Sequence, residues 1–344
     1  MKRTAGKRAA VRIRFREESG KEKEMGEENT FDGILDAERY RVKEGQKVDL
    51  SKWSTVCDAD MEKEWVKAVY FPNALDRLKE YQEKLFAQGT YGLIIVLQAM
   101  DAAGKDSTIN HVFSNLDPGG VNVVSFKEPT SVDLSHDYMW RINKELPPRG
   151  NIGVFNRSHY EDVVITRIHN LVDNGSMPRE LIGDDIWETR YEQINNWEKY
   201  LYQNGFPMVK IFLHVSKKKQ QERLKERILN QKKNWKFALS DISERQHWEE
   251  YQKLYGEIIM ATSKEYSPWY IVPADNKWFT RYVVALIALR ELKRINPKFP
   301  KLDEKTAEAL KKLKELLSQS GEKNLDDIHR EMTSEKEKEK DCRC

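Results

Sequence analysis

The segment 98–108 contains residue types that bind phosphate groups. Its small residues Ala102, Ala103 and Gly104 leave backbone N–H groups free to face an anion, and the helix expected to follow adds its N-terminal dipole. Lys105 extends a mobile cation toward the same anion. Charge-assisted hydrogen bonds contribute about 1.5–3 kcal/mol each, so several together hold a polyanion against water. The segment therefore predicts a phosphate-binding loop.

This loop departs from the P-loop pattern at two positions. Ala99 stands where the pattern has glycine, which changes the expected loop conformation only slightly. Asp106 stands where a serine or threonine normally places its hydroxyl on magnesium. Two alternatives follow: Asp106 binds the metal directly, or the hydroxyl of Ser107 takes over. An ordinary turn between strand and helix is the competing interpretation, and the apolar strand pattern before the loop disfavours it.

A second polar cluster follows a later apolar segment. A kinase needs a carboxylate near such a strand end to hold magnesium or orient the nucleophile, and Glu161 and Asp162 are the candidates. Arg157 and Arg167 are candidates for bracing a transferring phosphoryl group. His159 has no metal-ligand partner at suitable spacing, so we interpret it as a packed or hydrogen-bonding histidine.

A basic stretch runs from residue 216 to residue 239. Arg223 and Arg227 are four residues apart and therefore share one face of a helix. A basic surface helix is the simpler interpretation. The position after the fourth expected strand favours instead a helical lid, which excludes water and neutralises charge during phosphoryl transfer.

Strands alternate with helices along most of the chain. Five short apolar segments are expected to be strands, at 93–97, 121–126, 152–155, 209–215 and 269–272. Helices are expected at 72–88, 281–294 and 303–318, and a capping box of Ser243 and Gln246 predicts another that ends near Thr262. This alternation favours an α/β fold of three layers, a five-stranded parallel sheet with helices on both faces. Ligands bind beyond the carboxyl ends of such strands, so the two polar clusters meet if their strands are neighbours.

Composition excludes several classes of protein. The chain has 344 residues and three cysteines, lacks an apolar run of the roughly 20 residues that span a bilayer, and has no secretory segment. We therefore expect a cytoplasmic protein without a membrane partner. The net charge of +3 says almost nothing about partners, and we expect no nucleic-acid partner. The basic run 2–16 is interpreted as a solvated tail rather than a polyanion site. We predict a disordered charged tail at 1–30, a single domain at 31–300 with its lid at about 216–242, and a C-terminal helix and charged tail at 301–344.

Five motifs occur in an order and spacing that resemble the polyphosphate kinase 2 family over roughly residues 50–295. They are Asp101-Ala-Ala-Gly-Lys-Asp106, Ser125-Phe126-Lys127, Phe155-Asn-Arg-Ser-His-Tyr-Glu-Asp162, Lys233-Asn-Trp-Lys-Phe237 and Tyr266-Ser-Pro-Trp-Tyr270. Each motif alone is weak, and the five in order are specific.

The resemblance implies a P-loop kinase fold like that of thymidylate kinase, in which polyphosphate replaces ATP as donor. Asp101 and Lys105 match the first motif of the family, the second motif falls on Asn156, Arg157, Glu161 and Asp162, and the lid arginines are Arg223 and Arg227. Asn156, where some subgroups carry aspartate, resembles the subgroup that accepts both AMP and ADP. The family also implies a homo-oligomer.

We therefore predict a reversible transfer of the terminal phosphoryl group of polyphosphate to AMP or ADP, which forms ADP or ATP. Mg²⁺ is expected on Asp101 and Asp162, and Lys127 is expected to guide the anionic chain. Two alternatives remain open. One is an ATP-dependent nucleotide or small-metabolite kinase, and the other is a polyanion-binding protein without catalytic activity.

Overall fold

The computed structural model describes residues 35–173 and 177–319. The chain divides into two compact units, one that ends at Pro297 and one that begins at Lys298. The predicted N-terminal tail and most of the predicted C-terminal tail lie outside the described residues. Within the described part, no helix is long and apolar enough to cross a membrane.

The first unit is built on a single mixed sheet of six strands. In chain order they are β1 Arg41–Val42, β2 Leu93–Ala99, β3 Val121–Ser125, β4 Ile152–Asn156, β5 Met208–His214 and β6 Trp269–Pro273. Their order across the sheet is β1-β6-β5-β2-β4-β3, with β2 to β6 parallel and β1 antiparallel to β6. The sheet has one strand more than the five that were predicted. The additional strand, β1, has two residues and is too short to produce a periodic pattern.

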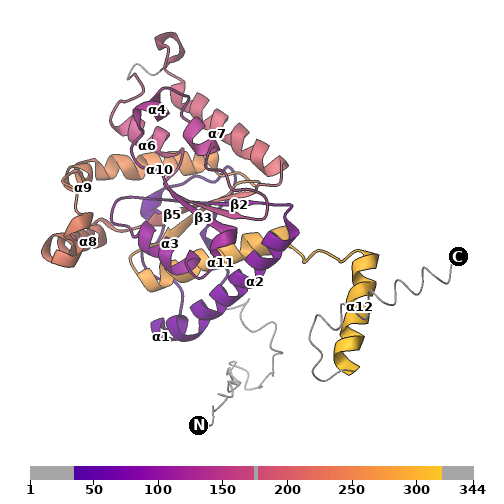
Figure 1. Ribbon diagram of the computed structural model, residues 1–344. Coiled ribbons are helices and arrows are strands. Elements are labelled where there is room, and N and C mark those ends of the chain that lie inside the picture. The colour runs from indigo at the N-terminus through magenta and orange to yellow at the C-terminus, as the bar shows by residue number, and fades with distance from the viewer. Residues whose placement is uncertain (1–34, 174–176, 320–344) are drawn as a thin grey trace. The chain divides into compact units, whose positions relative to one another are not determined.

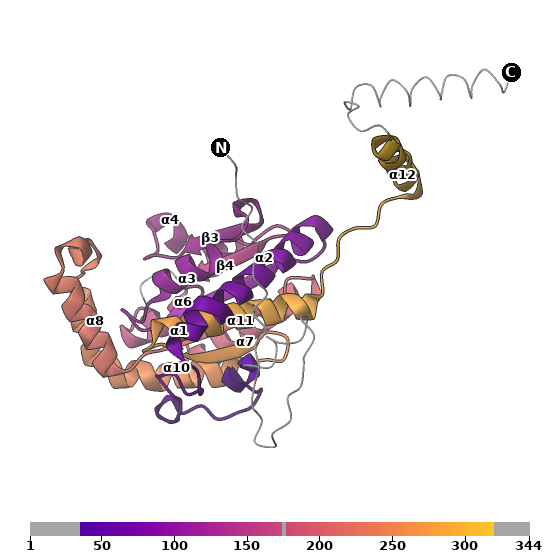
Figure 2. The ribbon, with the colours of Figure 1, turned by 90° about the horizontal axis from the view of Figure 1, so that it is seen from below.

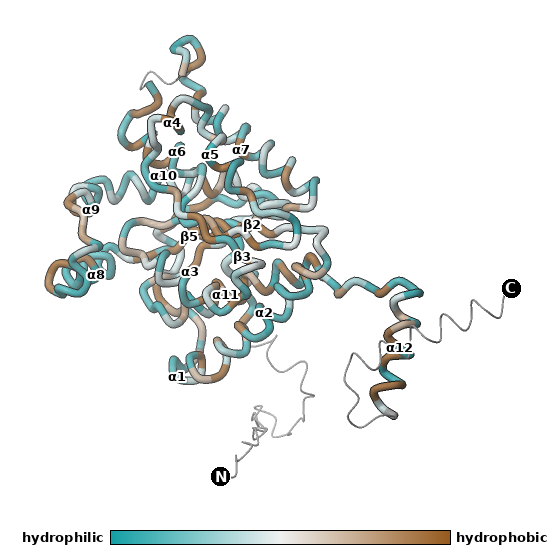
Figure 3. Tube along the Cα trace, viewed as in Figure 1, coloured by the Kyte–Doolittle hydropathy of each residue, from teal (hydrophilic) through white to brown (hydrophobic). Residues whose placement is uncertain are grey.

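Helices cover both faces of this sheet (Figure 1). One face carries α2 Phe71–Gln88, α3 Lys105–Phe113 and α11 Lys277–Ile295, and the other carries α6 Glu161–Ile168, α7 Ile186–Gln203 and α10 Trp248–Thr262. Residues of β2 and β5 are buried throughout, as expected for strands covered on both sides. Figure 3 shows these central strands as the apolar interior of the unit.

Short elements complete the first unit. They are α1 Lys63–Trp65, a π-helical turn Val66–Tyr70, α4 Ser131–Leu134, α5 Trp140–Asn143, α8 Lys217–Leu229 and α9 Ser240–Ser243. Single turns of 3₁₀-helix occur at Ala37–Tyr40, Leu50–Lys52, Pro118–Gly120, Arg179–Leu181, Gln231–Lys236 and Glu244–His247. Figure 2 shows α8, the helix of the expected lid, extending away from the sheet.

Local sequence chemistry explains some of the helix ends. Helix α2 ends at Gly89, whose φ of 62° is the left-handed conformation that glycine adopts most easily. The predicted capping box at Ser243 is wrong, because its hydroxyl donates backwards to the carbonyl of Ser240 and α10 begins only at Trp248. In the second unit, α12 Glu304–Gln319 forms the expected helix, and Asp303 accepts a hydrogen bond from the backbone of Thr306.

Candidate active site

The predicted phosphate-binding loop connects β2 to α3. Gly104, the residue before α3, has a φ of 107°, and Ala102 has a φ of 58°. A Cβ atom on Gly104 would meet its nearest neighbour, the guanidinium of Arg223, only at 3.8 Å, so the backbone conformation rather than space requires glycine there. The first N–H groups of α3 have no partner within the helix and remain available to an anion.

Lys105 lies at the centre of the charged groups. Its side chain is 9% exposed, and its Nζ donates a hydrogen bond of 3.1 Å to the carbonyl of Ala99. Burial, reinforced by the nearby Arg157, lowers the pKa of Lys105, while the carboxylates of Asp101 and Glu161 raise it. The first and second motifs of the sequence therefore meet at this ammonium group.

Arg157 joins two predicted catalytic carboxylates. Its Nη2 lies 3.2 Å from Oδ1 of Asp101, and its Nη1 lies 3.6 Å from Oε2 of Glu161. Burial alone would lower the pKa of Arg157, but Glu161 and Asp101 outweigh burial and raise it. The backbone of Arg157 has a φ of 65°, which is uncommon outside glycine and costs about 1–3 kcal/mol. The surrounding ion pairs hold this strained residue in place.

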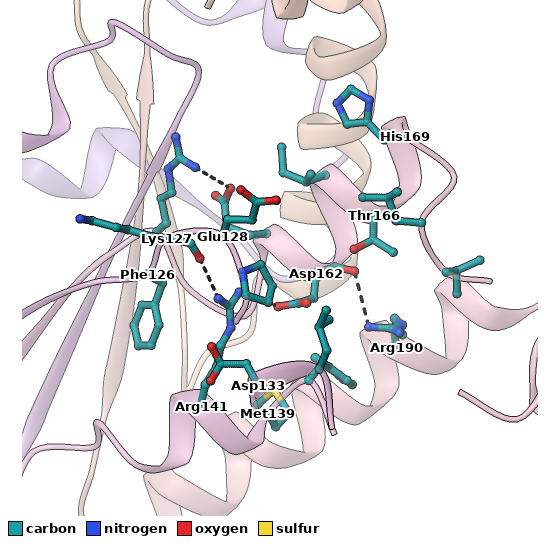
Figure 4. A pocket seen from close by; sticks show the side chains of 18 of the residues that line it. Phe126, Lys127, Glu128, Asp133, Met139, Arg141, Asp162, Thr166, His169 and Arg190 are labelled. Atoms are coloured by element: carbon teal, nitrogen blue, oxygen red, sulfur yellow. Dashed lines mark hydrogen bonds and ion pairs between the residues drawn. The ribbon is translucent and has the colours of Figure 1, made fainter. Parts of the chain in front are cut away.

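Asp162 and the two arginines that hold it line a large cavity (Figure 4). Its Oδ2 lies 3.3 Å from Nη2 of Arg141, whose Nη1 also donates to the carbonyl of Lys127 at 2.8 Å. Arg190 donates to the backbone carbonyl of Asp162 at 3.5 Å, and its guanidinium lies 4.4 Å from the ring centre of Tyr138. Burial raises the pKa of Asp162 to about 6, against the opposing effect of both arginines.

A cavity of about 1150 Å³ connects these groups. Its wall includes Asp101 and Arg157 together with Arg141, Asp162 and Arg190. Figure 4 shows the side chains of Arg141 and Asp162 together in this cavity. Such a space accommodates a ligand of nucleotide size, with cationic groups placed for its phosphates.

Asn156 ends β4 directly beside the loop, because Leu97 of β2 pairs with Asn156 in the parallel register. The side-chain amide of Asn156 donates to Oδ1 of Asp106 at 2.9 Å and to Oγ of Ser125 at 3.2 Å. Its own Oδ1 is buried without a hydrogen-bond partner within the described structure. The strands that carry the two polar clusters, β2 and β4, are therefore neighbours, as the prediction that the clusters meet requires.

The two lid arginines have different contacts. Arg223 donates to the carbonyls of Ala102 and Ala103, at 3.2 and 2.6 Å, and therefore touches the phosphate-binding loop. Arg227 pairs with Asp241 of α9 at 2.9 Å instead. The structure thus places Arg223 on the loop and Arg227 between α8 and α9.

Comparisons with known proteins identify the family of this chain. The family model described as polyphosphate kinase 2 matches residues 63–300. The chain belongs to the polyphosphate kinase 2 family. An ADP-polyphosphate phosphotransferase of Rhodopseudomonas palustris is 41% identical over 268 residues, which are 77% of this chain and 93% of the relative.

Two further similar proteins support this family membership. An AMP/ADP-polyphosphate phosphotransferase of Meiothermus ruber is 42% identical over 65% of this chain and 80% of its own length. The crystal structure of polyphosphate kinase 2 from Arthrobacter aurescens TC1 has a TM-score of 0.71 at 37% identity and covers 80% of this chain and 95% of that chain. The family predicted from the five motifs is confirmed.

Other candidate residues of this polyphosphate kinase 2 chain have structural partners. Arg167 contacts Glu257 and the hydroxyl of Tyr191, so its guanidinium is tied to α10 and α7. Lys127 contributes to the cavity wall. Ser107 accepts a hydrogen bond of 2.9 Å from Arg281 of α11.

The motifs did not reveal Arg141, Arg190 or Arg281. No local pattern marks these arginines, because their contacts join segments distant in the sequence. Arg281 and Ser107, for example, are 174 residues apart. Only their place in the folded chain connects them with the loop or the cavity.

A buried polar network contacts the second motif, residues 155–162. Glu198 of α7 accepts a hydrogen bond of 2.8 Å from the hydroxyl of Tyr160 and pairs with Lys210 of β5, and all three side chains are fully buried. His159 lies 3.4 Å from the same carboxylate and is also fully buried, which confirms its interpretation as a packed, hydrogen-bonding histidine. The turn that carries Glu161 is therefore anchored to α7 and β5.

Proposed function

We propose that this protein transfers the terminal phosphoryl group of inorganic polyphosphate to AMP and ADP, and that the transfer is reversible. The observation that carries the proposal is the meeting of Asp101, Arg157 and Glu161 in the wall of one large cavity, with Lys105 close to all three. The names of its relatives, an ADP-polyphosphate and an AMP/ADP-polyphosphate phosphotransferase, support the donor and both acceptors.

We infer a P-loop kinase domain like that of thymidylate kinase, with a lid at about residues 216–242. The position of a glycine-containing loop between β2 and α3 supports a P-loop. The contact of Arg223 with that loop supports a lid that closes over it.

In the proposed reaction, Lys105 and the amides of residues 104–107 hold the donor phosphates. Arg157 and Arg223 stabilise charge that spreads over the equatorial oxygens of the transferred group. Arg227 holds the lid through its ion pair with Asp241 of α9. Lys127, in the cavity wall, guides the anionic chain. Arg167 supports α6 through its contacts with α7 and α10. Catalysis consists mainly of positioning and electrostatics.

Mg²⁺ fits the donor set of this site. Asp101 and Asp162 offer carboxylate oxygens to the cavity, and Asn156 has a buried amide oxygen without a partner in the described residues. Mg²⁺ prefers oxygen ligands and is commonly bound through one or two carboxylates together with substrate phosphates. The described residues contain no cluster of three or more metal-ligating side chains, which agrees with a metal that arrives with phosphates. When bound, Mg²⁺ would neutralise charge on the phosphate oxygens.

We place the acceptor nucleotide in the part of the cavity that Arg141, Arg190 and Tyr138 line. Arg141 and Arg190 provide cations near Asp162, and the ring of Tyr138 lies against Arg190. These groups suit an acceptor phosphate and its attached nucleoside. A homo-oligomeric assembly remains a prediction from the family.

The deciding experiment measures ATP formation by the purified protein with long-chain polyphosphate, Mg²⁺ and either AMP or ADP, without added ATP. ATP from both acceptors is the expected result. ATP from ADP alone would reject the AMP/ADP subgroup. Turnover with ATP as the donor and none with polyphosphate would favour the alternative, an ATP-dependent kinase.

A further inference from the structure

Three consecutive carbonyl groups of the phosphate-binding loop accept hydrogen bonds from side chains of α8. Nε2 of Gln220 donates to the carbonyl of Asp101 at 3.0 Å. Nη1 of Arg223 donates to the carbonyls of Ala102 and Ala103 at 3.2 and 2.6 Å. The C=O and N–H groups of a trans peptide unit point in opposite directions, so each of these bonds also fixes the direction of the N–H that follows. Helix α8 therefore sets the backbone conformation of the loop.

The backbone does not adopt this conformation readily without such contacts. Ala102 has a φ of 58°, in the left-handed region that is unfavourable for a residue with a Cβ atom. Backbone strain of this kind persists only where the surrounding structure holds it. The preceding residue, Asp101, places its carboxylate 3.2 Å from Nη2 of Arg157. The ion pair at the cavity therefore depends on a turn that side chains of α8 hold.

Gln220 is buried, and both polar atoms of its amide have partners. The residue is 2% exposed and lies in the cavity wall. Its Oε1 accepts a hydrogen bond from Nη1 of Arg245, which belongs to the turn Glu244–His247 and also donates to the carbonyl of Lys217 at 3.3 Å. A guanidinium only donates hydrogen bonds, so Arg245 determines that the Nε2 end of the amide faces Asp101.

We propose that Gln220 is a positioning residue for phosphoryl transfer, which holds Asp101 and the turn after it in the conformation that the reaction requires. This inference rests on the proposed function and adds a residue outside the five motifs. Gln220 acts through the backbone of Asp101 and not by contact with a phosphate group. Arg245 acts one step further away, by orienting the amide of Gln220.

A purely structural role is the competing explanation, because the same hydrogen bonds attach α8 to the rest of the unit. Two substitutions separate the explanations. Gln220→Met keeps the length of the side chain and removes both hydrogen bonds. Gln220→Glu keeps an acceptor for Arg245, whose charge holds the new carboxylate ionised, but it has no donor for Asp101. Gln221, the exposed glutamine beside it on α8, provides the matched control Gln221→Met.

The test measures kcat and the KM for ADP, with long-chain polyphosphate as donor, at a temperature at which all variants are folded. In Gln220→Met and Gln220→Glu, kcat should fall about 10- to 100-fold, because a misplacement of about 1 Å costs up to about 100-fold in rate. The KM for ADP should stay close to that of wild type, and Gln221→Met should behave as wild type in both constants. A wild-type kcat in Gln220→Met, or its recovery in Gln220→Glu, would overturn the proposal.

Arg245→Met tests whether Arg245 acts through Gln220. This variant should lower kcat less than Gln220→Met does, because the amide can still donate to Asp101 in one of its two orientations. The double variant Gln220→Met with Arg245→Met should be no slower than Gln220→Met alone. Additive losses would overturn the orienting role of Arg245.

Hydrogen exchange keeps the test independent of turnover. The N–H of Ala103 donates to the carbonyl of Met100 at 3.2 Å and should exchange faster once the carbonyl of Asp101 is released. Faster exchange in peptides that cover residues 98–108 of Gln220→Met, but not of Gln221→Met, supports the proposal, and unchanged exchange refutes it. If the wild-type protein forms no ATP from polyphosphate, the proposed function fails, and exchange alone decides whether Gln220 holds the loop.

Discussion

The amide of Asn156 donates a hydrogen bond of 2.9 Å to the carboxylate of Asp106. Asp106 is the position at which the phosphate-binding loop departs from the P-loop pattern, and Asn156 is the position at which some family subgroups carry aspartate. The two residues are complementary here because an amide donates where a second carboxylate would repel. This contact links the second motif to the first turn of α3.

Asn156→Asp should therefore be unfavourable in this chain. It would place two carboxylates at hydrogen-bonding distance, and because Asp106 is exposed the expected loss of stability is at most about 1 kcal/mol. Asp106→Asn in the same chain should restore a hydrogen bond with donor and acceptor exchanged. Urea unfolding of the two single variants and the double variant gives the coupling energy. Additive effects in this cycle would show that the two side chains do not interact.

Lys105→Ala should remove most of the activity without unfolding the protein. Loss of a group that stabilises transition-state charge typically lowers kcat about 10²- to 10³-fold. The folded state loses one hydrogen bond, to the carbonyl of Ala99, which is worth about 1 kcal/mol. Steady-state kinetics and thermal unfolding separate the two effects. Wild-type turnover in this variant would rule out the proposed role of Lys105.

The features that could be predicted from the sequence are those formed by residues close together in the chain. The five predicted strands all appear in the sheet. Four of them, β2, β4, β5 and β6, are short apolar runs that the sheet buries, whereas β3 lies at its edge and is largely exposed. The two polar clusters meet because β2 and β4 are neighbours, a relationship that the sequence allowed but did not determine. Strand β1 was not predicted because its two residues, Arg41 and Val42, are too few to show the alternation of a strand.

Contacts between distant segments limited the prediction of the site. Glu198 and Lys210 look like ordinary surface charges in the sequence, yet both are fully buried and neutralise each other. Arg141 stands outside the five motifs but reaches Asp162. Such pairs depend on how helices pack on the sheet, which residue types and spacing do not specify.

Lys210→Met should destabilise the protein strongly. It leaves the carboxylate of Glu198 fully buried without its cation, and breaking a buried pair in this way costs about 3–5 kcal/mol. Adding Glu198→Gln removes the unpaired charge, keeps an acceptor for Tyr160, and should recover part of the loss. Urea unfolding measures both variants, with the exposed Lys199→Met as control. A double variant less stable than Lys210→Met would contradict this account.

The buried His159 predicts how stability depends on pH. Burial lowers the pKa of His159, with Glu198 opposing the shift, so the folded state keeps the ring neutral while the unfolded chain protonates it below its ordinary pKa of 6.5. The unfolded state then binds more protons, and stability falls as the pH drops below about 6.5, by at most about 1.4 kcal/mol per pH unit from this group. The free energy of unfolding of His159→Gln should change less between about pH 5 and 6.5. Identical slopes for both proteins would exclude His159 as a source.

Arg141→Gln should weaken acceptor binding more than donor binding. In the described structure the guanidinium of Arg141 contacts Asp162 and the carbonyl of Lys127 rather than residues 102–107. Loss of a charge-assisted contact corresponds to an increase in KM of about 10- to 100-fold for AMP and ADP. The KM for polyphosphate should change much less. Arg179→Gln, which removes an arginine with an 87% exposed side chain, is the matched control and should leave both KM values unchanged. If the KM for polyphosphate rises instead, Arg141 contacts the donor, and the acceptor is assigned to the wrong part of the cavity.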